Sequence, residues 1–389
     1  MSVKTLTTLG ALTCLALSLT GCGTDGANPR GASFGTQVCG QNWAIAPHYE
    51  QPFQPRPGGA ATLAGAGSSF AAPLMADWTQ HYRDERKVDI SYQSVGSGAG
   101  VAQIQAGAVD FGASDTGMSD DDITKAKGPV LQVPLLLGAV VPAYRLDRVD
   151  SGLKFTGDVL GKIYTGTITK WNDPALTALN PEVSLPDLPI RVVHRSDSSG
   201  TTGIWTDYLT KVSPEWVQKL GGPATAHGRD IAWPVGTGAK GNEGLTDQVK
   251  NTDGALGYLE LQYALAQDLT YGQVQNAAGK FIQPCALTVT KAVNAVDFPP
   301  NLVTSLTNGA DPDAYPIVGT TYALIYQNQT DPARAASLAN FLGWVLSSGQ
   351  DRNGTLSYAP LGPGLQSRAV DQIKKMTING TAILGTSQG

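Results

Sequence analysis

At positions 195–201 the chain reads Arg195-Ser196-Asp197-Ser198-Ser199-Gly200-Thr201, and this stretch says most about its fold. It follows a run typical of a β-strand at 190–193, and apolar residues recur at helical spacing from Ile204 to Val212 behind it. The sequence therefore places the stretch at the start of a helix, just after a strand. The free N–H groups and the dipole at a helix N-terminus favour a bound anion.

The side chains in this stretch predict a site for a small tetrahedral oxyanion. Ser199 and Thr201 supply hydroxyl groups, and Gly200 lets the backbone come close to a ligand. Arg195 supplies a fixed positive charge with several N–H donors. Asp197 stands two residues further on, where it can orient the arginine.

The composition is that of a turn-rich globular protein of 389 residues, with room for two domains. Its 46 glycines and 24 prolines point to many tight turns. The formal charge is −5 and the sequence holds no basic stripe, which argues against a nucleic-acid partner. Since the overall field of such a protein does not attract an anion, we expect local hydrogen bonds to hold the ligand.

The N-terminus reads as an export signal at residues 1–21. Lys4 gives a short positive region, and residues 6–19 form an apolar stretch that is too short to span a bilayer. The sequence then reads Leu19-Thr20-Gly21-Cys22, which resembles the bacterial lipobox, in which the cysteine is lipidated and becomes the mature N-terminus. A plain secretory signal cleaved nearby is the alternative, and an exported domain results either way.

Residues 22–60 are predicted to tether this anchor to the folded body. They are rich in Gly, Pro, Ala, Asn and Gln and show no sustained period. An ordered extension that packs on the body is the alternative, and Cys39, Trp43, Tyr49 and Phe53 favour it.

Two of the four cysteines remain after export. Cys14 lies in the signal and Cys22 would carry the lipid, which leaves Cys39 and Cys285 in an oxidising compartment. We predict a disulfide between them, with two unpaired cysteines as the alternative.

From Thr62 onward, strand-like and helix-like segments alternate. Leu74, Trp78 and Tyr82 share one helical face, and residues 88–92 alternate as a strand. Residues 130–141 form a long apolar run that Pro134 is expected to break. This alternation predicts an α/β fold with ligands at the C-terminal ends of the strands.

Three further segments resemble the first in architecture. Residues 65–70 and 96–100 are small-residue turns before a helix, and residues 110–115 close a third strand-to-turn unit. A single turn of this kind is usually only a helix cap. Together with Arg195, however, the three could surround one ligand.

The order and content of these segments resemble the phosphate-binding protein family of the bacterial phosphate ABC transporter. The resemblance covers roughly residues 62–373. The matching motifs lie at 65–70, 92–98, 110–115, 163–166, 170–173, 195–201, 233–236, 238–244, 257–260 and 316–321.

The resemblance implies a type II periplasmic-binding-protein fold, in which a hinge joins two α/β lobes and the ligand lies in the cleft between them. Lobe I would comprise residues 61–139 and 303–389, and lobe II residues 140–302. Hinge closure would bury the ligand.

Carried over position by position, the resemblance implies a set of phosphate contacts. Ser69 stands where relatives often have Thr, and Ser198 where they often have Gly; both keep the needed donors. Phe70 would contribute its backbone N–H, and Asp197 would hold Arg195. The implied set is Ser69, Phe70, Ser97, Asp115, Arg195, Asp197, Ser199, Gly200 and Thr201.

The implied function is capture of orthophosphate at the outer face of the cytoplasmic membrane and its delivery to the permease subunits, with a lipid anchor as the only membrane contact. No catalysis, cofactor or metal is expected, and the glycine pattern at 236–241 and the acidic run at 120–122 do not change this. Two alternatives stay open. One is a phosphatase that uses the same oxyanion cradle, and the other is a binder of a different oxyanion such as sulfate.

Overall fold

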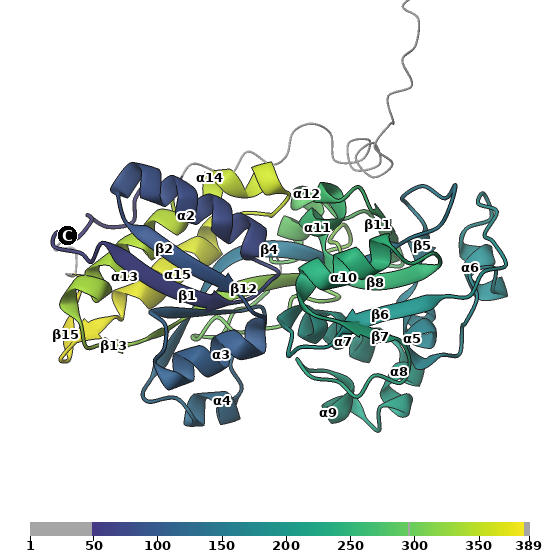
Figure 1. Ribbon diagram of the computed structural model, residues 1–389, viewed down its shortest axis with the longest axis horizontal. Coiled ribbons are helices and arrows are strands. Elements are labelled where there is room, and N and C mark those ends of the chain that lie inside the picture. Colours follow the sequence, from purple (N-terminus) through teal and green to yellow (C-terminus); the bar gives the residue numbers. More distant parts are fainter. Residues whose placement is uncertain (1–48, 295, 385–389) are drawn as a thin grey trace, which may run out of the picture.

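The computed structural model describes residues 49–294 and 296–384. In this part of the chain a nine-stranded sheet runs through the whole molecule in the order β2-β1-β3-β12-β4-β8-β6-β7, with β9 attached to β4 (Figure 1). Its strands are β1 (Thr62–Gly67), β2 (Asp89–Ser94), β3 (Phe111–Ser114), β4 (Val130–Tyr144), β6 (Arg191–Arg195), β7 (Thr237–Ala239), β8 (Ala255–Glu260), β9 (Thr270–Tyr271) and β12 (Val318–Tyr326).

Strand β4 joins two lobes. It pairs with β12 as far as Ala139 and with β8 from Val140 onward, both antiparallel. The first lobe contains β1, β2, β3 and β12, and the second contains β6, β7 and β8 (Figure 1). Because β1, β2 and β3 run parallel, their C-terminal ends meet at one edge of the first lobe. The two-lobed α/β fold predicted from the sequence is confirmed.

Helices cover the sheet in both lobes. The first lobe carries α2 (Ala72–Arg86), α3 (Ser97–Ala106), α13 (Pro332–Val345) and α15 (Pro363–Lys374), and the second carries α5 (Gly157–Thr165), α7 (Gly200–Val212), α8 (Pro214–Lys219) and α10 (Gly241–Lys250). The shorter elements are α4 (Asp120–Thr124), α6 (Pro174–Leu179), α9 (Pro223–Ala226), α11 (Leu261–Ala266), α12 (Ala286–Lys291), α14 (Gln350–Asn353), β5 (Lys154–Phe155), β10 (Gln273–Gln275), β11 (Phe281–Ile282), β13 (Asn328–Gln329), β14 (Thr377–Ile378) and β15 (Thr381–Ala382).

The predicted apolar face of α2 is buried as expected. Leu74 and Trp78 are fully buried and Tyr82 is 2% exposed. The indole N–H of Trp78 donates to the carbonyl of Gly349 at 2.9 Å, so the burial of this large ring leaves no polar atom unpaired.

The expectation that Pro134 breaks the apolar run is wrong. Strand β4 continues through it, and the register against β12 shifts between Thr321 and Tyr322, which face Leu136 and Pro134. Proline has no N–H to give to a ladder and is tolerated inside a sheet at such an irregularity.

The turn predicted at 65–70 is also partly wrong, because β1 extends through Gly67 and α2 begins at Ala72. Gly65 and Gly67 allow β1 to pack closely against β3. A Cβ at Gly65 would lie 2.1 Å from the ring of Phe111, and one at Gly67 would lie 2.0 Å from the carbonyl oxygen of Ala113. Gly67 also has φ +143°, a backbone conformation that residues with a side chain rarely adopt.

Residues 49–60 pack against the first lobe. The Tyr49 hydroxyl donates to the carbonyl of Leu361, and the Arg56 N–H donates to Asn340 Oδ1 at 2.8 Å. These contacts favour the ordered-extension alternative for this part of the predicted tether. The signal at 1–21, the lipidation site Cys22 and the disulfide partner Cys39 lie outside the described residues.

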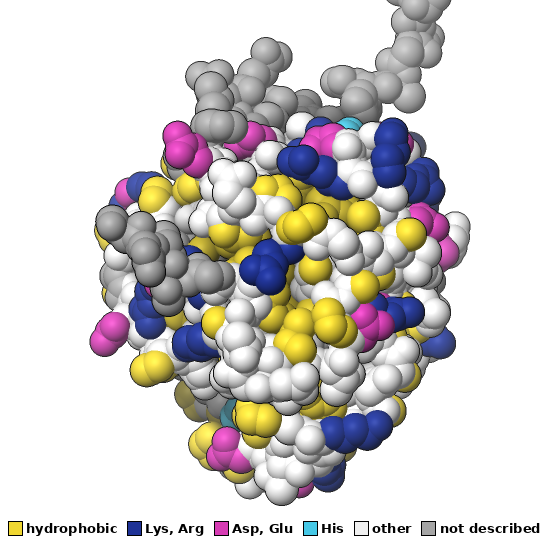
Figure 2. All heavy atoms as spheres, turned by 90° about the vertical axis from the view of Figure 1, so that its left-hand side faces the viewer, with side chains coloured by type: hydrophobic (Ala, Val, Ile, Leu, Met, Phe, Trp, Pro, Cys, Tyr) yellow, Lys and Arg dark blue, Asp and Glu magenta, His cyan; other side chains and the backbone are white. Residues whose placement is uncertain are grey.

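The outer face of the first lobe has no separate basic and acidic patches on its described part. On the described part of the face in Figure 2, Lys and Arg side chains are scattered among acidic and apolar ones. None of the helices in the described ranges is long and apolar enough to cross a membrane.

Candidate oxyanion-binding site

The predicted site residues converge where the two lobes meet. Ser69 and Phe70 follow β1, Ser97 begins α3, and Asp115 follows β3. The second lobe supplies the end of β6 and the start of α7, and the lobes touch here, since the Gly98 N–H donates to the carbonyl of Ser198 at 3.0 Å.

Gly200 shows how closely the lobes approach. A Cβ at this position would lie 2.4 Å from Ser97 Oγ and 2.7 Å from Asp115 Oδ2. The first turn of α7 can approach Asp115 this closely only because position 200 is a glycine. The sequence showed the glycine but not the residues against which it packs.

Asp197 holds the buried side chain of Arg195 in a bidentate pair. Its Nε donates to Oδ1 at 2.7 Å and its Nη2 donates to Oδ2 at 2.5 Å, and the arginine side chain is 1% exposed. The Gly241 N–H also donates to Asp197, at 3.0 Å. Burial alone would raise the pKa of Asp197, but the hydrogen bonds and charge of Arg195 outweigh it and hold that pKa below its ordinary value.

Asp115 is the buried acceptor of the site, with 4% of its surface exposed. Its Oδ1 accepts from the Ser68 and Thr321 hydroxyls, the latter at 2.7 Å, and its Oδ2 accepts from Ser97 at 3.1 Å. Burial raises the pKa of Asp115, and these hydroxyl groups and the charge of Arg195 oppose that shift only in part.

Backbone N–H groups complete the donor set. Ser199 is the N-cap of α7, with its Oγ accepting from the Thr202 N–H at 3.1 Å. Within the described residues, the N–H groups of Gly200, Thr201 and Phe70 have no hydrogen-bond acceptor. Orphan donors at a helix start and in a neighbouring turn are suited to an anion.

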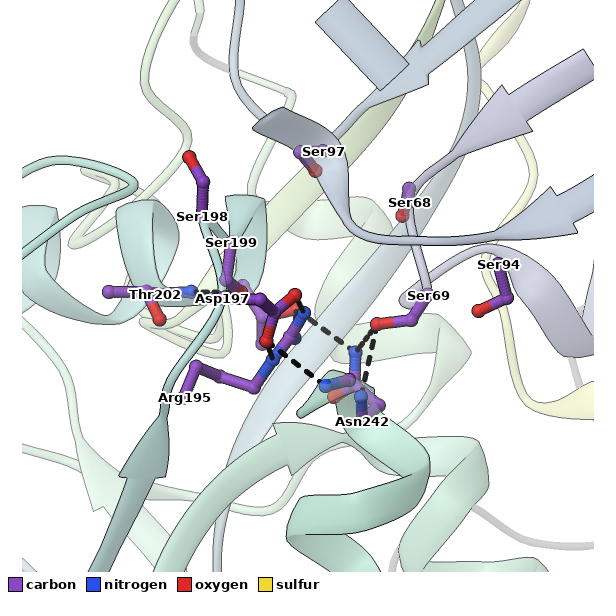
Figure 3. A network of polar contacts seen from close by, with 12 residues as sticks. Ser68, Ser69, Ser94, Ser97, Arg195, Asp197, Ser198, Ser199, Thr202 and Asn242 are labelled. Carbon is purple, nitrogen blue, oxygen red and sulfur yellow. Dashed lines mark hydrogen bonds and ion pairs between the residues drawn. The ribbon is translucent and has the colours of Figure 1, made fainter. Parts of the chain in front are cut away.

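All nine predicted contact residues therefore lie in one place, with Arg195 and Asp197 facing the Ser69 side of the site in Figure 3. The sequence reasoning missed several residues that contact them. Among these are Ser68 and Thr321, the hydroxyl partners of Asp115, and Asn242, which donates to both Ser69 and Thr201. Asn242 and Thr321 stand within matching motifs, but their spacing along the chain gave no sign of these contacts.

The acidic run at 120–122 has a structural role. Ser119 and Asp122 form a capping box at the start of α4, and Asp122 also pairs with Arg229 at 2.5 Å. Among the described residues, no group of three or more His, Cys, Asp or Glu side chains is placed to hold a metal ion.

Comparison with known proteins agrees with this geometry. Residues 54–348 match the family model of the PBP superfamily domain. The phosphate-binding protein PstS of Xylella fastidiosa (strain Temecula1) is 39% identical over 360 residues, which is 90% of this chain and 93% of that protein. The PstS of Pasteurella multocida is 39% identical over 305 residues, 78% of this chain and 87% of that protein.

Solved structures show the same fold at lower identity. A high affinity periplasmic phosphate-binding protein (PfluDING) bound with phosphate is 19% identical, with a TM-score of 0.65 over 84% of this chain and 100% of that one. The phosphate binding protein of Stenotrophomonas maltophilia is 20% identical, with a TM-score of 0.59 over 80% of this chain and 94% of that one. The sequence relatives and the matching fold together show that this chain belongs to the PBP superfamily and, within it, to the PstS family of phosphate-binding proteins.

Proposed function

We propose that this protein captures inorganic phosphate outside the cytoplasmic membrane and delivers it to the permease subunits of an ABC transporter. The observation that carries the proposal is the buried cradle in which Arg195, the free N–H groups at the start of α7 and the acceptor Asp115 face one another across the two lobes. Relatives whose names state phosphate binding support it.

The proposed ligand contacts lie on both lobes. The contact set is Ser69, Phe70, Ser97 and Asp115 from the first lobe, and Arg195, Ser199, Gly200 and Thr201 from the second, with Asp197 holding the arginine. Closure of the lobes would exclude water and strengthen each hydrogen bond.

We further propose lobe boundaries at 139/140 and 302/303. The change of β4 partner between Ala139 and Val140 supports the first crossing. Near the second, Leu302 has φ +62° and its carbonyl accepts from the Tyr322 hydroxyl at 3.2 Å. A cavity of about 410 Å³ continues from Asp115 between α7 and residues 303–307, as expected for a cleft that opens and closes there.

The export signal, the tether and lipidation at Cys22 belong to the same proposal. A receptor that serves a membrane permease gains from being held at the membrane surface, and one lipidated cysteine supplies that anchor. Mass spectrometry of the N-terminal peptide from membrane fractions tests it. A peptide that begins at lipid-modified Cys22 is expected, and an unmodified N-terminus at another residue would overturn the anchor.

Binding rather than catalysis is supported by the relatives, whose names state phosphate binding. A phosphatase would need an activated nucleophile aimed at a phosphoryl group. Incubation with a chromogenic phosphomonoester separates the two functions: no turnover is expected, and sustained turnover would establish the enzyme.

The central experiment is calorimetric titration of ligand-stripped protein with phosphate and, separately, with sulfate. One phosphate site per chain is expected, with sulfate bound at least about tenfold more weakly, since sulfate has no proton to offer Asp115. Equal or tighter binding of sulfate would assign the site to another oxyanion, and no binding of either would overturn the proposal.

A further inference from the structure

We infer that Asn242 is a positioning residue that sets two hydroxyl groups of the cradle, Ser69 and Thr201, as hydrogen-bond donors toward the anion. The inference rests on the proposed function and deepens it, because it concerns what makes this cradle accept only ligands rich in acceptors. Asn242 is the second residue of α10 and is fully buried.

The orientation of the Asn242 amide is fixed by its surroundings. Its Oδ1 accepts from the backbone N–H of Glu260 at 3.1 Å. A flipped amide would set Nδ2 against that N–H, two donors facing each other, so the carbonyl must point to β8. The Nδ2 group therefore points toward the cradle, where it donates to Ser69 Oγ at 3.0 Å (Figure 3). It also donates to Thr201 Oγ1 at 3.1 Å.

The Ser69 hydroxyl can act toward the ligand only as a hydrogen-bond donor. A hydroxyl oxygen has two lone pairs and one O–H. Both lone pairs of Ser69 are engaged, by the backbone N–H of Asn242 at 3.0 Å and by its Nδ2 at 3.0 Å. Within the described residues the Ser69 hydroxyl donates to no acceptor, so its proton is available to the ligand.

The hydroxyl oxygen of Thr201 also has both of its lone pairs engaged. Its Oγ1 accepts from Asn242 Nδ2 at 3.1 Å and from Arg195 Nη1 at 3.4 Å. Its hydroxyl, too, donates to no acceptor in the described part of the chain. One amide thus turns a serine of the first lobe and a threonine of the second into donors at once, and it can do so only when the lobes are together.

This arrangement gives five hydroxyl groups of the site two different roles. The hydroxyl groups of Ser68, Ser97 and Thr321 donate to Asp115. The hydroxyl groups of Ser69 and Thr201 remain able to donate to the ligand. Without Asn242, each of the latter could rotate and offer a lone pair, which an anion does not accept. The amide therefore determines specificity without touching the ligand itself.

A double-mutant cycle tests the inference. Asn242→Leu, of similar size and without donors, should weaken phosphate binding about tenfold or more by calorimetry. In a Ser69→Ala/Thr201→Val background the same change should cost less than about threefold, because the hydroxyl groups through which Asn242 acts are gone. A purely structural role would give the same loss in both backgrounds, and that result would overturn the inference.

Two further variants sharpen the test. Asn242→Asp replaces the donors by acceptors that draw the hydroxyl protons away, and it should weaken binding more than Asn242→Leu. Thr246→Val, one turn along α10, removes a buried hydroxyl that donates to the backbone carbonyl of Asn242, and it should leave affinity within about twofold. Should Asn242→Leu fail to fold, Asn242→Ala gives the same cycle.

The outcomes also separate this inference from the proposed function. Wild-type protein that binds no phosphate would overturn both. Wild-type protein that binds phosphate, with Asn242 variants that bind equally well, would overturn the positioning role alone.

Discussion

The buried Arg195 and the partly buried Asp197 form a bidentate ion pair, with Nε–Oδ1 and Nη2–Oδ2 distances of 2.7 and 2.5 Å. The pair is neutral as a whole, and Asp115 adds a buried carboxyl group to the same site. An anion in the proposed cradle would therefore be held by directed N–H and O–H donors and not by an excess of positive charge. That agrees with a chain whose formal charge is −5.

Replacing Arg195 by alanine should reduce phosphate affinity by at least about two orders of magnitude, at roughly 1.4 kcal/mol per decade. The change removes the one cation of the proposed contact set and leaves the partly buried Asp197 without its counter-charge. Calorimetry measures the loss. Arg191→Ala, at the exposed start of β6, is the matched control and should bind normally. Binding by Arg195→Ala at the wild-type level would refute the site assignment.

Asp115→Asn should keep measurable phosphate binding but lose discrimination against sulfate. Phosphate at neutral pH carries an O–H group that can donate a hydrogen bond to Asp115. Fully ionised sulfate has no such group, so two acceptors would face each other, at a cost of roughly 1–3 kcal/mol. The asparagine amide supplies a donor that either ligand accepts. Competition titrations measure the preference, and Asp110→Asn, which removes the partner of Arg334 at the far end of β3, is the control. An unchanged preference in Asp115→Asn would assign the role elsewhere.

Glu260→Gln should become more stable relative to wild type as the pH rises. Burial holds the pKa of Glu260 well above the ordinary 4.5 in the folded protein. The unfolded chain then loses this proton first, so the wild type loses stability from about pH 4.5 upward, by at most about 1.4 kcal/mol per pH unit. Chemical denaturation at several pH values measures the difference between the two proteins.

The control for this experiment is Glu215→Gln. Hydrogen bonds from Thr167 and Thr165 lower the pKa of Glu215, so its contribution to stability is present above pH 4.5 and disappears as the pH falls. The two variants should therefore diverge from wild type in opposite directions. A difference between Glu260→Gln and wild type that does not change with pH would show that Glu260 is ionised in the folded state.

Cys39 and Cys285 should form a disulfide in the exported protein. Cys285 is 1% exposed and caps α12, so a bond to Cys39 would fix the N-terminal extension onto the second lobe. Peptide mapping without reductant should recover the two cysteines in one linked peptide. Recovery of both as free thiols from protein purified from the cell envelope would contradict the pairing.

Local sequence determined much of this protein. The apolar patterns at 190–193 and 204–212 predicted the strand and the helix that flank residues 196–199, and the spacing of Arg195 and Asp197 was enough to predict their pairing. Ser119 caps α4 together with Asp122, three residues further along the chain. These features rest on interactions between residues a few positions apart, which spacing and residue type describe directly.

Only the tertiary structure decided which distant groups share the cradle. Ser69 and Asn242 are 173 positions apart, and Asp115 and Thr321 are 206 apart, so no local pattern links them. Pro134 inside a continuous strand and Gly200 pressed against Ser97 have the same explanation, because each depends on the shape of a partner strand or lobe. The sequence alone thus pointed to the residues of the proposed site, whereas the packing of two lobes determined which hydroxyl groups donate to Asp115.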